Sequence, residues 1–149
     1  MMEEAAMRRS VSVVMLATVG ALALGAPASS GADPAFWTSF SGAAEVPGPG
    51  DPDGGGAALL HISSTQVCYK LGVVNIAPAT AAHIHLGAAG VAGPVVVSLQ
   101  PPTSGASKAC ATVAPALASA IIANPANYYV NVHNAAYPGG AIRGQLARK

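Results

Sequence analysis

Two histidines separated by a single residue, His83 and His85, are the residues of this sequence best suited to chemistry. Side chains two positions apart on a β-strand project from the same face, so both imidazoles would point the same way. Imidazole nitrogen is a preferred ligand of zinc and copper. The pair therefore offers half of a metal site, although a His-x-His sequence by itself also occurs by chance.

A third histidine, His133, ends a second strand-like segment in which polar and apolar residues alternate. Tyr129, Asn131 and His133 share one face of that segment, whereas the residues between them are apolar. The next segment alternates apolar residues with Arg143 and Gln145. We therefore expect Arg143 beside His133 on one polar face of the sheet.

Two interpretations of this polar face remain open. In the first, the histidines, Tyr129, Asn131 and Arg143 form a hydrogen-bonded network, because buried polar groups need partners; Arg143 would then donate to a histidine or to Asn131. In the second, His83, His85 and His133 bind one copper or zinc ion. We favour the network, because the positive charge of Arg143 opposes a nearby cation. His61 lies in an earlier strand and is expected to be a packed or edge residue.

The rest of the chain after residue 32 supplies the elements that position these side chains. Short strand-like runs are separated by turn residues, which is typical of a β-sandwich or barrel. The predicted strands are 37–46, 57–62, 66–74, 81–86, 94–99, 108–113, 127–133 and 141–146. An alanine-rich run with proline in its first turn predicts one short helix over about 115–123. We thus predict an all-β, antiparallel sandwich or barrel-like domain with one short helix.

Two further local expectations concern strand ends and loops. In the segment 81–86, Ile84 and Leu86 alternate with the histidines and are expected in the core. Residues 47–56 are dominated by proline and glycine, which prevent regular structure. We expect that run to be an exposed loop.

The N-terminal segment has the pattern of a signal peptide. Arg8 and Arg9 precede an apolar run from Val11 to Ala26, and small residues follow it. The run is shorter than the roughly 20 residues of a bilayer span, so an uncleaved membrane anchor is the less favoured alternative. We predict a signal peptide over 1–32 and one domain over 33–149, secreted to the extracellular space or cell envelope. No membrane span is expected after cleavage.

The predicted export determines how the two cysteines are interpreted. Cys68 and Cys110 are the only cysteines, and an even number in an oxidising compartment indicates a disulfide. Period 2 places both on the polar faces of their strands, so the bond would lie near the surface. Two free buried thiols are the alternative.

Composition and motifs argue against several functions. Charged residues make up 9% of the chain and the net charge is +1, without the clustered basic face of a nucleic-acid binder. There is no Gly-x-Ser-x-Gly motif. After residue 32, three of the four carboxylates lie at the start or in the proline–glycine run, a poor basis for an acid–base pair. Four histidines are too few for a dinuclear copper–zinc dismutase. We assign no catalytic residue.

Four ordered motifs resemble the CHRD domain, the module named after chordin. They are Phe40 to Pro47; Ala82 to Gly87 with Gly93 to Val96; Tyr128 to His133; and Tyr137 to Leu146. The resemblance covers about residues 38–146. It implies an extracellular β domain, in bacteria mostly a single exported domain, with no established reaction. The chain departs from the family pattern at Gly48 and Ala141, where a proline and a carboxylate are frequent, and the latter change removes a possible anchor for Arg143.

Two functions are consistent with these observations. The first is a non-catalytic extracellular binding or structural module whose partner is a protein, a glycan or a cell-surface component. The second is a mononuclear copper- or zinc-binding protein that uses His83, His85 and His133, with superoxide-dismutase-like chemistry as a further alternative. The first is favoured, and an enzymatic role is not.

Overall fold

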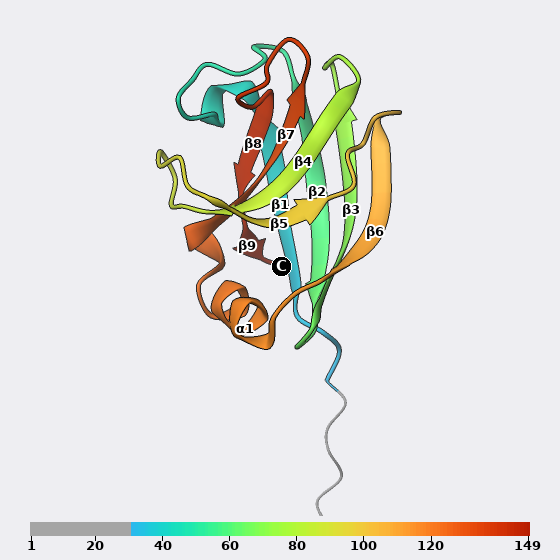
Figure 1. Ribbon diagram of the computed structural model, residues 1–149, viewed down its shortest axis with the longest axis vertical. Helices are drawn as coiled ribbons and strands as arrows, with labels where there is room; N and C mark the ends of the chain where they lie inside the picture. Colours follow the sequence, from blue (N-terminus) through green and yellow to red (C-terminus); the bar gives the residue numbers. More distant parts are fainter. Residues whose placement is uncertain (1–30) are drawn as a thin grey trace, which may run out of the picture. The chain divides into compact units, whose positions relative to one another are not determined.

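In the part of the chain that the structure describes, nine strands form one antiparallel sheet that curls into a nearly closed barrel with a single short helix (Figure 1). The computed structural model describes residues 31–149, so the predicted signal peptide over 1–32 lies almost entirely outside the described residues. The strands are β1 (Ala35–Ser41), β2 (Gly55–Ile62), β3 (Gln66–Val74), β4 (Ala79–Leu86), β5 (Val95–Leu99), β6 (Ala106–Thr112), β7 (Tyr128–Asn134), β8 (Ile142–Gln145) and β9 (Ala147–Arg148). The prediction of an all-β, antiparallel, barrel-like domain is confirmed.

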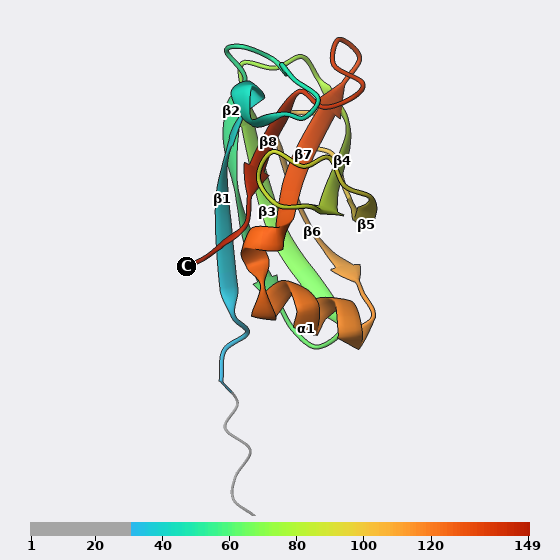
Figure 2. The ribbon, with the colours of Figure 1, turned by 90° about the vertical axis from the view of Figure 1, so that its left-hand side faces the viewer.

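The strands follow the order β5-β4-β7-β8-β1-β2-β3-β6, and β9 extends the pairing of β1. The edge strands β5 and β6 approach each other across the gap in the barrel (Figures 1 and 2). Gln100 bridges this gap, because its N–H donates to the Tyr69 hydroxyl at 2.7 Å and its carbonyl accepts from the Ser107 hydroxyl at 2.8 Å. The sheet is thus almost closed upon itself.

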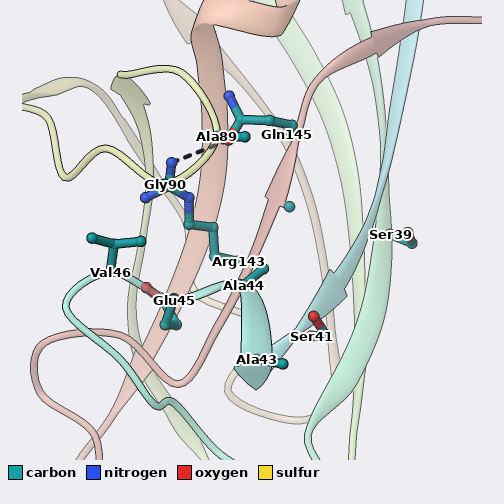
Figure 3. Close-up of a pocket in the computed structure, with 11 residues that line it drawn as sticks. Ser39, Ser41, Ala43, Ala44, Glu45, Val46, Ala89, Gly90, Arg143 and Gln145 are labelled. Carbon is teal, nitrogen blue, oxygen red and sulfur yellow. Dashed lines mark hydrogen bonds between the residues drawn. The ribbon is translucent and has the colours of Figure 1, made fainter.

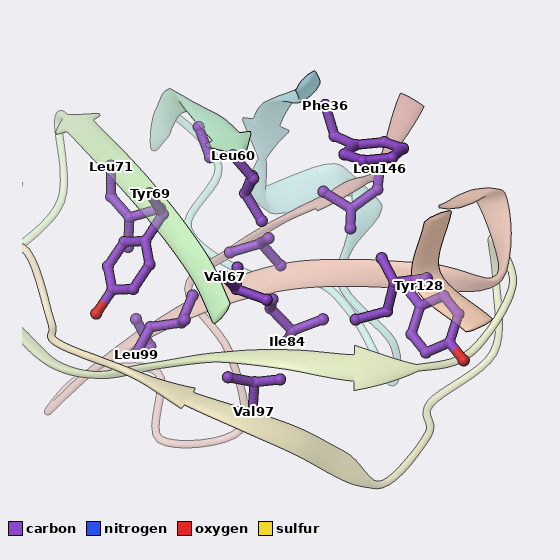
Figure 4. Close-up of a cluster of buried hydrophobic side chains, with 14 of the residues drawn as sticks. Phe36, Leu60, Val67, Tyr69, Leu71, Ile84, Val97, Leu99, Tyr128 and Leu146 are labelled. Carbon is purple, nitrogen blue, oxygen red and sulfur yellow. The ribbon is translucent and has the colours of Figure 1, made fainter. Parts of the chain in front are cut away.

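Alternate residues of the strands point into the barrel and form the core (Figure 4). Fully or nearly buried members include Phe36, Leu60, Val67, Leu71, Ile84, Val130, Val132, Ile142 and Leu146. The opposite face of the same strands carries the polar residues and the histidines. Period 2 in the sequence therefore assigns most side chains to the correct side of the sheet.

The helix α1 (Pro115–Ala123) lies at one end of the barrel, at the bottom of Figures 1 and 2. Ala118 and Ile121 are buried, and Pro115 occupies the first turn, where its missing N–H costs nothing. The predicted helix is confirmed with the same bounds. Within the described part of the chain, no helix is long and apolar enough to cross a membrane.

Three local expectations were wrong. The strand predicted over 37–46 ends at Ser41, and the 3-10 turn η1 (Gly42–Ala44) follows. Only glycine fits at position 42, because a Cβ atom there would overlap the backbone carbonyl of Asp51 in the proline–glycine run. That run is not an exposed loop throughout. The backbone N–H of Gly50 donates to the carbonyl of Gly42, and that of Asp51 donates to the carbonyl of Ala141.

The third correction concerns Leu86, which is 44% exposed rather than in the core. The register shift between β4 and β5 falls in β5, where Val96 is the extra residue, and β4 keeps a regular register with β7 through Leu86. Leu86 is exposed because it is the last residue of β4, where the strand leaves the sheet. The short strand β9 was not predicted at all.

A disulfide joins β3 to β6. Cys68 and Cys110 are direct partners in the register of these strands, and their sulfur atoms are 2.04 Å apart. Cys110 is exposed and Cys68 is half-buried, so the bond lies on the outer face of the sheet. The predicted disulfide is present.

Candidate functional site

The candidate site lies on the outer face of three adjacent strands, β4, β7 and β8. In their register, His83 is opposite Asn131 and His85 is opposite Tyr129. Asn131 in turn is opposite Arg143 of β8. Side chains directly opposite one another in an antiparallel pair are near neighbours on one face. The sheet therefore gathers polar residues from distant parts of the chain.

The three histidines converge. One ligand atom from each of His83, His85 and His133 lies within 4.8 Å of the other two. The closest pair is His83 Nδ1 and His133 Nε2, 3.1 Å apart. Two nitrogens bound tetrahedrally to zinc at 2.0–2.1 Å would lie about 3.3 Å apart. The arrangement is close to that of a chelating pair with a third imidazole beside it.

Backbone carbonyls fix the orientation of two of the rings. His85 Nδ1 lies 2.9 Å from the Gly93 carbonyl oxygen, and His133 Nδ1 lies 3.0 Å from that of Pro138. Since a carbonyl oxygen only accepts, each Nδ1 carries the hydrogen and donates it. The lone pair of each ring is then on Nε2, the arrangement in which protein imidazoles bind metals. In residues 31–149, the buried Nε2 of His85 has no hydrogen-bond partner.

Asn131 supplies an oxygen at the same place. Its Oδ1 lies 3.0 Å from His133 Nε2, and the side chain is 3% exposed. When His133 carries its proton on Nδ1, two lone pairs face each other across this distance. A cation between them, or rotation of the amide to present its NH₂ group, removes the conflict. Asn131 is therefore the candidate fourth ligand.

Burial favours the neutral form of His83 and His133. Desolvation lowers the pKa of His83, and the proximity of His133 and His85 lowers it further. Desolvation also lowers the pKa of His133, against the opposing effect of its hydrogen bond to Pro138. Neutral imidazole is the form that binds a metal ion.

These pKa shifts predict acid sensitivity of the metal-free protein. Because the folded state holds His83 and His133 below their usual pKa of 6.5, the unfolded chain binds more protons below that pH. The free energy of unfolding should therefore fall as the pH drops from about 7 to 5. Urea unfolding of wild type and of the double variant His83→Gln/His133→Gln, both in EDTA, measures this at each pH.

The double variant should lose the histidine part of the slope. Other titrating groups contribute equally to both proteins, so the difference between the two curves isolates the imidazoles. His61 is exposed on β2 and lies outside the cluster, so His61→Gln serves as the matched control. Parallel curves for wild type and the double variant would show that these imidazoles are not desolvated.

Arg143 contacts the site through an aromatic ring. The His85 ring stacks on Tyr129 with centroids 4.7 Å apart, and the Arg143 guanidinium carbon lies 3.3 Å from the Tyr129 centroid. Since β7 lies between β4 and β8, the two side chains approach the tyrosine from opposite sides. The ring thus separates the cation of Arg143 from the imidazoles.

The hydrogen bonds of Arg143 differ from those expected. It donates to the carbonyls of Ala88 and Val91 and to the side chain of Gln145, each at 2.9–3.1 Å, rather than to a histidine or Asn131. Its charge is therefore held by the loop between β4 and β5. The electrostatic objection to a cation among the histidines is weaker than the sequence suggested.

A pocket that sequence reasoning missed lies beside Arg143 (Figure 3). It has a volume of about 470 Å³ and is lined by residues of β1, η1, β8 and the β4–β5 loop. Glu45, which lines it, is 6% exposed, and burial raises the pKa of its carboxyl to about 7 despite the charge of Arg143. One signal in the sequence was available: Glu45 is the single carboxylate after residue 32 outside the start and the proline–glycine run.

Fold and site together define a class: small antiparallel barrel-like β domains with a cluster of imidazoles on one outer face. The chain belongs to the CHRD family, because the family model described as the CHRD domain matches residues 36–146. The resemblance drawn from the four motifs is thereby confirmed. Comparisons with curated proteins and with solved structures find no match.

Proposed function

We propose that this chain is an exported CHRD module that binds one copper or zinc ion through His83, His85 and His133. The observation that carries the proposal is the convergence of one ligand atom from each imidazole within 4.8 Å. At the level of the family, the CHRD domain indicates a non-catalytic extracellular module. Metal binding is the specific role that the site supports best within that class.

A purely structural network explains this geometry less well. A network should satisfy the buried polar atoms, because an unpaired buried group costs about 1–3 kcal/mol. Among the described residues, however, His85 Nε2 is buried without a partner. A bound cation supplies the partner that this nitrogen lacks.

The donor set favours copper and zinc over harder ions. Three neutral imidazoles with an amide oxygen suit both metals, and copper(II) generally binds such nitrogen sites more tightly than zinc. Because His83 and His133 are only half-buried, solvent has access to the site. An extracellular partner, whether a protein, a glycan or another cell-surface component, would meet the module at this or another surface.

Two features support export. The first 32 residues have the charge, apolar and small-residue pattern of a signal peptide. The disulfide between Cys68 and Cys110 is compatible with an oxidising, extracellular environment. The proposed location is the extracellular space or the cell envelope.

Metal titration tests the proposal. Tag-free protein stripped with EDTA should bind one equivalent of copper(II), and one of zinc(II), in a calorimetric titration at pH 7.5. His85→Ala and His133→Ala should each weaken binding by at least about 100-fold, since even second-shell partners contribute about 10–100-fold to affinity. Asn131→Ala should have a smaller effect.

The matched control is His61→Ala. His61 is exposed on the same sheet but is not part of the cluster, so its removal should leave the affinity unchanged. Absence of one-to-one binding, or binding that His85→Ala does not affect, would leave the hydrogen-bonded network as the role of the three histidines.

A further inference from the structure

The pocket beside Arg143 is separate from the histidine cluster. It lies between β1, η1 and β8, with Ala89 and Gly90 of the β4–β5 loop on its rim (Figure 3). The Tyr129 ring stands between Arg143 and His85. Arg143 lines the pocket, and none of the proposed metal ligands does.

Arg143 brings a buried positive charge to this pocket. The side chain is 1% exposed, and its three hydrogen bonds all end on neutral acceptors. A guanidinium has five N–H donors, so among residues 31–149 these bonds leave two of them without an acceptor. Buried charges in proteins are normally paired. A negative group is the missing complement.

Glu45 does not supply that complement. In residues 31–149, its Oε1 is buried and has no hydrogen-bond partner. The carboxyl packs directly against Gly140, where a side chain would not fit because its Cβ would lie 2.5 Å from the Glu45 carboxyl carbon. Burial raises the pKa of Glu45 to about 7, so a large fraction carries a proton at neutral pH. In that form the carboxyl is a hydrogen-bond donor.

We propose that this pocket binds a small organic monocarboxylate, whose carboxylate pairs with the guanidinium of Arg143 and accepts a hydrogen bond from Glu45. The exposed hydroxyls of Ser39 and Ser41 line the same pocket and offer two further donors. Arg143 is the one cationic side chain among the lining residues, so the charge matches a monoanion.

The other residues that line the pocket indicate that the anion also has a nonpolar organic part. Ala43, Ala44, Val46 and Ala89 present small apolar groups. The volume of about 470 Å³ exceeds what a bare carboxylate needs and is within the range of small-molecule sites. Both a free short-chain acid and the uronic acid residue of a glycan have this chemistry.

Binding of two probes to the full exported domain distinguishes these sources. Propionate represents the free acid and glucuronate the uronic acid, with propionamide and glucose as neutral matched controls. Titration in EDTA, followed by NMR chemical shifts, should show saturable binding of at least one acid with a Kd below about 10 mM. The neutral controls should not bind. Tighter binding of glucuronate would identify the glycan source, and tighter binding of propionate the free acid.

The pH dependence tests the role assigned to Glu45. Arg143 is the charged side chain that acts on this carboxyl, and a guanidinium stays protonated throughout the range used. Above pH 7 the ionised carboxylate should repel the ligand, so affinity should fall by about tenfold per pH unit. Glu45→Gln keeps the shape but cannot ionise. It should retain binding and lose the pH dependence.

One more variant defines the site. Ala44 is exposed on η1 and lines the pocket, so Ala44→Phe should block the acids without disturbing the core. Because the titration is carried out in EDTA, binding of the acids there does not depend on a bound metal ion, which separates this proposal from metal binding. The proposal is overturned by failure of both acids to bind, by an unchanged pH dependence in Glu45→Gln, or by unaltered binding in Ala44→Phe.

Discussion

Replacing Cys68 and Cys110 together with alanine is expected to lower the free energy of unfolding by about 4 kcal/mol. The disulfide closes a loop with a sequence separation of 42, and the cross-link removes the corresponding chain entropy from the unfolded state. For a domain whose total stability is in the usual range of about 5–15 kcal/mol, this is a large fraction. Urea unfolding of both proteins at the same pH measures the difference.

Reduction supplies the control for this prediction. A reducing agent should lower the melting temperature of wild type toward that of the double-alanine variant and leave the variant unchanged. A loss below about 1 kcal/mol would mean that the unfolded chain keeps β3 and β6 close without the bond.

Replacing Arg143 with methionine is expected to cost about 3–5 kcal/mol of unfolding free energy. The substitution leaves the carbonyls of Ala88 and Val91 without their donor, and it removes the cation from the face of Tyr129. Methionine keeps much of the aliphatic volume, so the effect measures the lost polar contacts rather than a cavity. Urea unfolding monitored by circular dichroism provides the measurement.

Arg148 is the matched control. Its guanidinium also lies over an aromatic ring, 5.3 Å from the centroid of Phe36, and it donates one hydrogen bond to the carbonyl of Ile122. The residue is exposed, so Arg148→Met should change stability by no more than about 1 kcal/mol. Equal effects of the two substitutions would refute the view that the buried contacts of Arg143 hold the β4–β5 loop in place.

That loop connects the two candidate sites. Gly93 accepts the hydrogen bond of His85, while Ala88 and Val91 accept those of Arg143. Tyr129 lies between them, and its hydroxyl accepts a hydrogen bond from the Gly93 N–H at 3.1 Å. The same loop, residues 87–94, therefore orients the imidazole on one side of the ring and the guanidinium on the other.

The sequence by itself determined the features that depend on local pattern. Alternation of apolar and polar residues fixes which face of a strand a side chain occupies, so His83 and His85 were correctly expected to project together, with Ile84 in the core. Turn residues separate the strands, and an alanine-rich run with Pro115 at its start gives the helix. The even cysteine count predicted the bond between Cys68 and Cys110.

Only the tertiary structure decided the features that depend on pairing between distant segments. The end of β1 at Ser41, the burial of Asp51 and the exposure of Leu86 all follow from which segment packs beside each one. The two carbonyl partners of Arg143 come from a loop more than 50 positions away, and Glu45 is buried because a glycine turn near residue 140 closes over it. Such contacts are set by the order of strands in the sheet, which no local periodicity encodes, because the period of 2 specifies a face but not a neighbour.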